Sequence, residues 1–143
     1  RGLGDVYKRQ LLAAPGSRAS GVEADAARAA RAMENAAGFG VAQRLHLLQR
    51  RAPDGLESLA RPDAIFIGGG ASQALLERLW ALAAPGTRLV ANAVTLESEA
   101  LLTAWSAAKG GSLLRLELAE AAPLGGKRGW VPARPIVQWS VTL

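Results

Sequence analysis

The stretch that decides the fold is DAIFIGGG, in which Asp63–Ile67 runs directly into Gly68-Gly69-Gly70. A continuous apolar run that ends in glycines is typical of a buried strand whose carboxyl end opens into a loop. The next segment, SQALLERLWALA at Ser72–Ala83, has helical periodicity, and Ser72 stands where a helix N-cap belongs. A strand, a glycine turn and a helix in this order predict one unit of an α/β sheet.

The same alternation continues on both sides of this unit. The predicted strands are Arg18–Val22, Arg44–Leu48, Asp63–Ile67, Thr87–Ala91, Ser112–Ala119 and Ile136–Thr142, and the predicted helices are Ala24–Ala37, Ser72–Ala83 and Leu96–Ala108. Strands separated by helices favour a mainly parallel sheet with helices on both faces. A loop is predicted at Pro123–Pro135, and no helix separates the last two strands, so these should pair antiparallel.

Composition narrows the class of protein. The chain has 143 residues, half of them hydrophobic, which suits a single domain with a real core. It has no Cys and one His, so a disulfide scaffold, thiolate catalysis and Cys- or His-based metal sites are excluded, and no metal is expected. No apolar run approaches the roughly 20 residues of a membrane span. The expectation is a cytoplasmic protein without a membrane partner.

The net charge of +5 has two interpretations. One is a general preference of this composition for Arg. The other is a polyanionic partner, which would be either a nucleic acid or a small molecule with several carboxylates. Charge alone does not decide between them.

Three candidate sites fall at the carboxyl ends of predicted strands, where open α/β sheets bind ligands. Glu23 is placed to accept hydrogen bonds from ribose hydroxyls, although an acid in a first helical turn is also favoured by the helix dipole. The glycines Gly68, Gly69 and Gly70 would let a ligand approach the backbone closely, or simply form a flexible turn. Asn92 would orient a substrate or cofactor with its amide, or form a strand-end turn.

A fourth candidate is the basic, aromatic segment Gly125–Pro135, GGKRGWVPARP. Arg128 and Arg134 could hold carboxylates, and Trp130 could stack on a flat ring. The alternative is a solvated loop whose charges bind nothing specific. Met33 and Trp80 lie at helical positions and are predicted to be core residues.

Four segments together resemble one family. They are APGSRASGVEAD (14–25), RPDAIFIGGG (61–70), LVANAVTLESEALL (89–102) and GWVPARPIVQW (129–139). They look like the methyltransferase domain of the decarboxylating precorrin-6Y methylases of cobalamin biosynthesis. The resemblance implies a Rossmann-like class I methyltransferase fold with S-adenosylmethionine as cofactor and a precorrin as substrate.

The resemblance also implies roles for individual residues. Glu23 would bind the cofactor ribose, Ala52 would lie near the adenine, and Gly68–Gly70 with Asn92 would line the site that cofactor and substrate share. The reaction would transfer a methyl group to a ring carbon and remove carbon dioxide from an acetate side chain. That carbon is itself the nucleophile, so the protein mainly positions the two reactants, with Asn92 as the candidate catalytic residue and Arg128, Trp130 and Arg134 on the substrate.

The sequence departs from the family at its start. The family opens with a strand and a D-x-G-x-G-x-G loop, and neither is found here. Residues 1–10, RGLGDVYKRQ, match nothing in the family and are interpreted as an unrelated or artefactual lead. Residues 11–143 would then be a partial domain without its first strand.

Such a chain could be an inactive fragment, and a class I RNA methyltransferase is the alternative function. With the precorrin assignment no nucleic-acid partner is expected. A homo-oligomer, or fusion to a second methylase domain, is possible.

Overall fold

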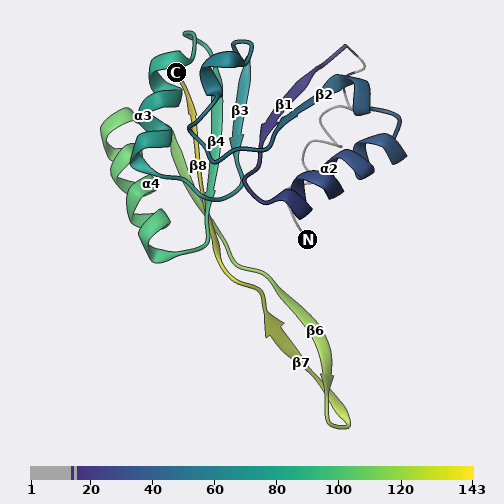
Figure 1. Ribbon diagram of the computed structural model, residues 1–143. Coiled ribbons are helices and arrows are strands. Elements are labelled where there is room, and N and C mark those ends of the chain that lie inside the picture. Colours follow the sequence, from purple (N-terminus) through teal and green to yellow (C-terminus); the bar gives the residue numbers. More distant parts are fainter. Residues whose placement is uncertain (1–13, 15) are drawn as a thin grey trace. The chain divides into compact units, whose positions relative to one another are not determined.

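The computed structural model describes residue 14 and residues 16–143 (Figure 1). Within it the chain forms two compact units, Arg1–Ala60 and Arg61–Leu143. Each unit has its own sheet. The predicted lead sequence at 1–10 lies outside the described residues.

The first unit is a strand–helix–strand motif. Its elements are β1 (Ala19–Val22), α2 (Ala26–Gly38), β2 (Leu45–Leu48) and two short 3-10 turns at Ala42–Arg44 and Leu56–Ser58. Strands β1 and β2 pair in parallel, with Ala19 opposite Leu45. Helix α2 starts two residues later than predicted, because the Asp25 carboxylate caps it by accepting from the backbone N–H of Arg28 at 2.8 Å.

The core of this unit is small. Ala36, Val41 and Leu45 are buried together, and Ala19 and Ala42 pack against them. Met33, predicted as core, is 37% exposed. That prediction was wrong because helical spacing places Met33 on the sheet side of α2 but does not show that the sheet reaches far enough to cover it.

The second unit is a four-stranded sheet with two helices. Its elements are β3 (Ala64–Ile67), α3 (Gln73–Leu82), β4 (Arg88–Ala93), α4 (Leu96–Lys109), β5 (Ser112–Leu116) and β8 (Ile136–Thr142). The strand order is β3-β4-β8-β5. Strands β3 and β4 are parallel, whereas β8 runs antiparallel to both β4 and β5. The predicted α/β class and the antiparallel pairing of the last two strands are confirmed.

Three tryptophans hold the helices of this unit to one face of its sheet. Trp139 on β8 is fully buried, and its ring stacks on Trp80 of α3 with centroids 6.4 Å apart. Trp105 of α4 lies 5.8 Å from Trp80 and 6.2 Å from Trp139, so α3 and α4 cover the same face (Figure 1). The indole of Trp139 donates to the carbonyl of Gly110 at 2.9 Å, which satisfies its one polar atom. The prediction that Trp80 is a core residue fits this cluster.

The opposite face of this sheet carries polar side chains near its centre. Side chains alternate between faces along a strand, so Asn92 and Gln138 point away from the face of Trp139. They stand opposite each other in the β4–β8 ladder, and both are half-buried. The described part of the second unit therefore has one tryptophan-rich face and one face with an amide pair.

A long β-hairpin replaces the loop predicted at Pro123–Pro135. Strand β5 ends at Leu116, and β6 (Ala119–Leu124) pairs antiparallel with β7 (Lys127–Pro132). Figure 1 shows the hairpin projecting from the sheet of the second unit. Gly125-Gly126 forms the two-residue loop that joins the strands, with Gly125 at a φ of 58°. The prolines misled the prediction because they act as strand breakers except on edge strands such as these.

Candidate functional site

Two of the candidate groups meet at the carboxyl end of the β3–β4 pair. Ile67 stands opposite Ala91 in the parallel register, so Gly68 follows β3 at the level of Asn92. Parallel strands end at the same edge of a sheet, and this edge is where α/β folds bind ligands. The structure therefore brings together Gly68–Gly70 and Asn92, which sequence reasoning had selected separately.

The glycine loop has room for a ligand. A Cβ atom built on Gly69 or Gly70 would meet no other atom within 4 Å. Gly70 has a φ of 72°, which favours glycine by itself. Gly69 is not in the left-handed region, so neither backbone conformation nor crowding inside the protein demands glycine there. The close approach of a ligand to the backbone remains as a reason for glycine at position 69.

Asn92 is held by a residue that sequence reasoning missed. The Nε2 amide of Gln138 donates to Oδ1 of Asn92 at 3.0 Å. This leaves the Nδ2 amide of Asn92 as a donor for a ligand at the end of β4. The signal for Gln138 was available, because it is a polar residue inside the otherwise apolar start of strand IVQW, but its partner depends on strand register.

Glu23 lies at the equivalent place in the first unit, directly after β1. Its backbone N–H donates to the carbonyl of Leu48 at 3.0 Å, which ties it to the end of β2. Its Oε1 accepts from the backbone N–H of Asp25 at 2.8 Å and from the guanidinium of Arg28 at 2.9 Å. Only 15% of the Glu23 side chain is exposed. Arg28 was not predicted as a site residue.

These contacts set the charge of Glu23. The side-chain hydrogen bond from Arg28 is the main cause that holds the pKa of Glu23 below its usual range, while partial burial opposes it. The N–H of Asp25 adds to the lowering. Glu23 is consequently an ionised acceptor at neutral pH, with its carboxylate fixed in direction.

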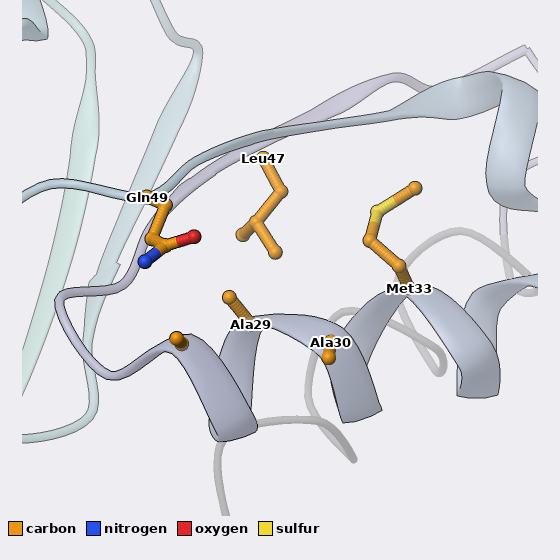
Figure 2. A pocket seen from close by; sticks show the side chains of 6 residues that line it. Ala29, Ala30, Met33, Leu47 and Gln49 are labelled. Atoms are coloured by element: carbon orange, nitrogen blue, oxygen red, sulfur yellow. The ribbon is translucent and has the colours of Figure 1, made fainter.

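A pocket of about 250 Å³ opens between α2 and β2 in the same unit. Figure 2 shows the side chains of Ala29 and Met33 on the helix turned toward the strand that carries Leu47, and Ala30 and Gln49 also line the pocket. The lining is apolar apart from the amide of Gln49, which follows β2. Ala26 completes it, and lies three residues after Glu23. Ala52, the residue expected near an adenine, is not among the lining residues.

The three candidate substrate residues lie at different distances from the sheet. Arg134 stands two residues before β8, whose first residues pair with Leu116 and Ala93, so it is close to the carboxyl end of β4. Trp130 is 75% exposed on the hairpin, and Arg128 is further out. At about 3.3 Å per residue, Arg128 is roughly 20 Å along the chain from Arg134. Neither arginine forms an ion pair with a described residue.

The described residues contain no group of three or more His, Asp and Glu side chains that could bind a metal ion. None of the helices that the structure describes has the length and hydrophobicity that a membrane span requires.

A family profile described as precorrin methyltransferase domain matches residues 1–143. The chain belongs to the precorrin methyltransferase domain family. A curated relative from Sinorhizobium sp., named precorrin-6Y C(5,15)-methyltransferase [decarboxylating], is 45% identical over 142 residues. That match covers 99% of this chain but 34% of the relative, so the chain spans about a third of the curated relative's length.

Two solved structures extend the comparison. The C-terminal domain of precorrin-6Y C5,15-methyltransferase from Rhodobacter capsulatus has a TM-score of 0.85 at 51% identity, covering 90% of this chain and 70% of that one. A domain described as a putative precorrin-6Y C5,15-methyltransferase from Corynebacterium diphtheriae has a TM-score of 0.90 at 33% identity, covering 97% and 83%. The resemblance given by IFIGGG and ANAVTLE, and the class I methyltransferase fold it implies, are confirmed.

Proposed function

We propose that this precorrin methyltransferase domain transfers a methyl group from S-adenosylmethionine to a ring carbon of a precorrin, with loss of carbon dioxide from an acetate side chain. The observation that carries the proposal is the match to a decarboxylating precorrin-6Y methyltransferase over 99% of the chain. Membership of a methyltransferase family supports S-adenosylmethionine as the methyl donor.

The first unit fits the nucleoside part of that cofactor. An ionised, fixed carboxylate at the end of a parallel strand suits two ribose hydroxyls, and Glu23 has these properties. Both hydrogen bonds that described residues make to the Glu23 carboxylate are to Oε1. Oε2 is therefore the atom that we assign to the ribose. The apolar pocket beside α2 suits a flat ring, with the Gln49 amide to bind its polar edge. Ala52 follows β2 in the same loop and would contribute only contact area.

In the second unit, Gly68–Gly70 and Asn92 would form the wall against which the reactants lie. S-adenosylmethionine supplies an electrophilic methyl group, and the electron-rich tetrapyrrole carbon is the nucleophile. The residues of this chain then have to hold the acceptor in line and exclude competing arrangements. The Nδ2 amide of Asn92, fixed by Gln138, would hydrogen-bond the acceptor at the end of β4.

A precorrin carries many carboxylates, which fits arginines that form no ion pair with a described residue. Arg134 is the residue placed best for this, because it stands next to the carboxyl end of β4. Arg128 and Trp130 are on the projecting hairpin. From there they could both contact a substrate as large as a tetrapyrrole macrocycle. The net charge of +5 is then explained by a polycarboxylate partner, and no nucleic acid is required.

Titration calorimetry with S-adenosylmethionine tests the cofactor assignment on this chain. We expect saturable binding that Glu23→Gln weakens by about tenfold or more, since a hydrogen bond to a charged group contributes roughly 1.5–3 kcal/mol. Glu34→Gln is the matched control, because it removes an exposed acid from α2 and should leave affinity unchanged. Absence of binding by the unaltered chain would contradict the assignment for this chain and favour an inactive fragment.

Methyl transfer is tested separately, with isotope-labelled S-adenosylmethionine and a precorrin-6Y-type substrate. Incorporation of label together with release of carbon dioxide would support the proposed reaction. Cofactor binding with label transferred to RNA instead of the tetrapyrrole would support the RNA methyltransferase and overturn the precorrin assignment.

A further inference from the structure

A side-chain hydrogen bond joins the two helices that follow the candidate site in the second unit. The indole N–H of Trp105, on α4, donates to Oε1 of Gln73 at 2.8 Å, across 32 residues of sequence. Gln73 is the first residue of α3 and stands just after the loop that ends at Gly70. Helix α4 follows Asn92 in the same way, because its N-cap is Thr95. The bond therefore links the helix behind the glycine loop to the helix behind the amide donor.

The Gln73 amide is held at both of its polar atoms. Its Nε2 donates to Oε1 of Glu77, one turn further along α3, at 2.7 Å. Its Oε1 accepts from the indole of Trp105. A glutamine on a helix surface ordinarily keeps several rotamers, and ordering it costs conformational entropy. The two bonds give Gln73 one direction although this residue is exposed.

The Trp105 end of the link is anchored in the core of the second unit. Trp105 is only 9% exposed and packs against the rings of Trp80 and Trp139. A buried indole N–H needs a hydrogen-bond partner, and Trp139 finds one in the backbone carbonyl of Gly110. Trp105 instead uses the side chain of Gln73. The rigid tryptophan cluster is thereby tied to the first residue of α3.

The glycine loop has few contacts of its own that fix its direction. A Cβ atom on Gly69 or Gly70 would meet no other atom within 4 Å. Among the described residues, Gly69, Gly70 and Ala71 make none of the backbone hydrogen bonds that hold the turns and helix ends elsewhere. Glycine also has more backbone freedom than any other residue. The direction of this loop is consequently set by its two ends, which are β3 and the first turn of α3.

The first turn of α3 has one local contact and one distant contact. Ser72 caps the helix by accepting from the backbone N–H of Leu75, which orders the turn but ties it to nothing outside α3. Gln73 ties the same turn to α4 through Trp105. The position of the loop's exit relative to Asn92 and the core therefore depends on Gln73.

We propose that Gln73 is a positioning residue, which keeps the glycine loop in its ligand-binding shape by tying the start of α3 to Trp105. The inference rests on the proposed function, because that function assigns Gly68–Gly70 to the site. Gln73 acts without touching S-adenosylmethionine or the precorrin. When Gln73 is lost, the loop samples more directions, and a ligand has to order the loop as it binds. That ordering lowers the affinity.

Nuclear magnetic resonance without ligand tests the link itself. Backbone order parameters report motion from picoseconds to nanoseconds. In Gln73→Leu and in Trp105→Phe, the order parameters of the amides at 69–71 should fall, while those of β4 stay unchanged. Gln73→Glu combined with Glu77→Gln keeps an acceptor for the indole without placing two acids together, and should keep the loop ordered. Unchanged loop order in both Gln73→Leu and Trp105→Phe would overturn the inference.

Titration calorimetry with S-adenosylmethionine tests the consequence for the site. Gln73→Leu should weaken binding by roughly three- to tenfold, the effect of one side-chain hydrogen bond. Adding Trp105→Phe to Gln73→Leu should cause no further loss, because both changes break the same bond. The variant with Gln73→Glu and Glu77→Gln should bind like the unaltered chain, which a general loss of stability does not explain. Gln43→Leu, which removes an exposed amide from the first unit, is the control and should bind fully.

The two measurements separate this inference from the proposed function. Full affinity in Gln73→Leu, or no recovery in the variant that keeps the acceptor, would overturn the positioning role while leaving the methyltransferase proposal intact. Absence of binding by the unaltered chain would instead contradict the cofactor assignment, and the loop measurement would still decide whether Gln73 holds the loop. Near-ultraviolet circular dichroism would show that each variant keeps its tryptophan cluster.

Discussion

Gln138 donates its Nε2 amide to Oδ1 of Asn92 across the β4–β8 ladder, at 3.0 Å. The two residues are 46 positions apart in sequence and stand opposite each other in the register. The bond occupies the one acceptor of the Asn92 side chain, so the Nδ2 group is directed elsewhere. A mobile amide at the end of a strand thereby becomes a fixed donor.

The first prediction concerns this pair. Asn92→Ala should lower the kcat of methyl transfer by about a hundredfold, the size of effect found when one preorganised donor is removed. Gln138→Leu should lower kcat by about tenfold, because the Asn92 amide is still present but Gln138 no longer fixes its direction. Gln138→Glu should be at least as harmful, since an acceptor there would turn the Nδ2 group of Asn92 toward itself.

Steady-state kinetics with calorimetry of cofactor binding check this prediction. The affinity for S-adenosylmethionine should change little, because the cofactor ribose is assigned to Glu23 in the other unit. Gln43→Leu is a control, since this exposed amide bonds only the carbonyl of Gly40 among the described residues. Equal kcat values for Gln138→Leu and the unaltered protein would show that Gln138 has no positioning role.

The second prediction concerns pH. The pKa of Glu23 is lowered in the folded protein, so its ion pair stabilises the fold above the unfolded pKa of about 4.3 and stops doing so as the pH falls through the folded value. Arg28→Gln removes the main cause of the lowering. This variant should lose less stability than the unaltered protein as the pH falls through and below the ordinary glutamate range, and the difference should be small because Arg28 is exposed.

Urea unfolding at several pH values measures that difference. The Arg31→Gln variant is the control, because Arg31 is on the same helix and forms no ion pair with a described residue. An Arg28→Gln profile that parallels the unaltered one would mean that the ion pair is lost in solution. Cofactor affinity should be flat between about pH 6 and pH 8, since Glu23 stays ionised there.

Much of the fold followed from local patterns. The apolar run Asp63–Ile67, the glycines after it and the cap at Ser72 each act within a few residues, and the structure has β3, the turn and α3 where they indicated. The antiparallel pairing of β5 and β8 followed from the absence of a helix between them. Glu23, Gly68 and Asn92 were selected as candidates because strand ends are predictable positions for ligands, and the structure places each of them at or next to such an end.

What escaped prediction depends on register and on partners distant in sequence. Gln138 could be paired with Asn92 only once β8 was known to lie against β4. Arg28 was missed because the helix after Glu23 was considered only for its dipole, and not for a basic side chain that reaches back to the carboxylate. The hairpin was missed because its prolines and glycines indicated a loop, whereas Gly125-Gly126 forms a turn between two strands.

The third prediction concerns the tryptophan cluster. Trp139 is fully buried, with Trp80 stacked on it and Trp105 beside it. Trp139→Ala should therefore destabilise the second unit by about 3–5 kcal/mol, the cost of a large cavity. Trp130→Ala is the matched control, because this side chain is 75% exposed and its loss should change stability by under about 0.5 kcal/mol.

Urea unfolding followed by tryptophan fluorescence measures both variants. A loss below about 1 kcal/mol in Trp139→Ala would mean that the cluster does not hold α3 and α4 to the sheet. A large loss of stability in Trp130→Ala would mean that this hairpin side chain is covered in solution.

The last prediction separates glycines needed for the fold from glycines kept for a ligand. Gly111 has a φ of 88°, and an added Cβ would collide with the Ser140 carbonyl and lie 2.9 Å from the Trp139 indole nitrogen. Gly111→Ala should therefore lower the free energy of unfolding by about 2 kcal/mol or more. At Gly69 the added Cβ meets nothing within 4 Å, so Gly69→Ala should leave the free energy of unfolding within about 0.5 kcal/mol. If a ligand approaches this backbone, Gly69→Ala should nevertheless weaken binding of S-adenosylmethionine or the precorrin by about tenfold. Urea unfolding and calorimetry on the same two variants give both quantities, and full binding by a stable Gly69→Ala protein would remove the glycine loop from the site.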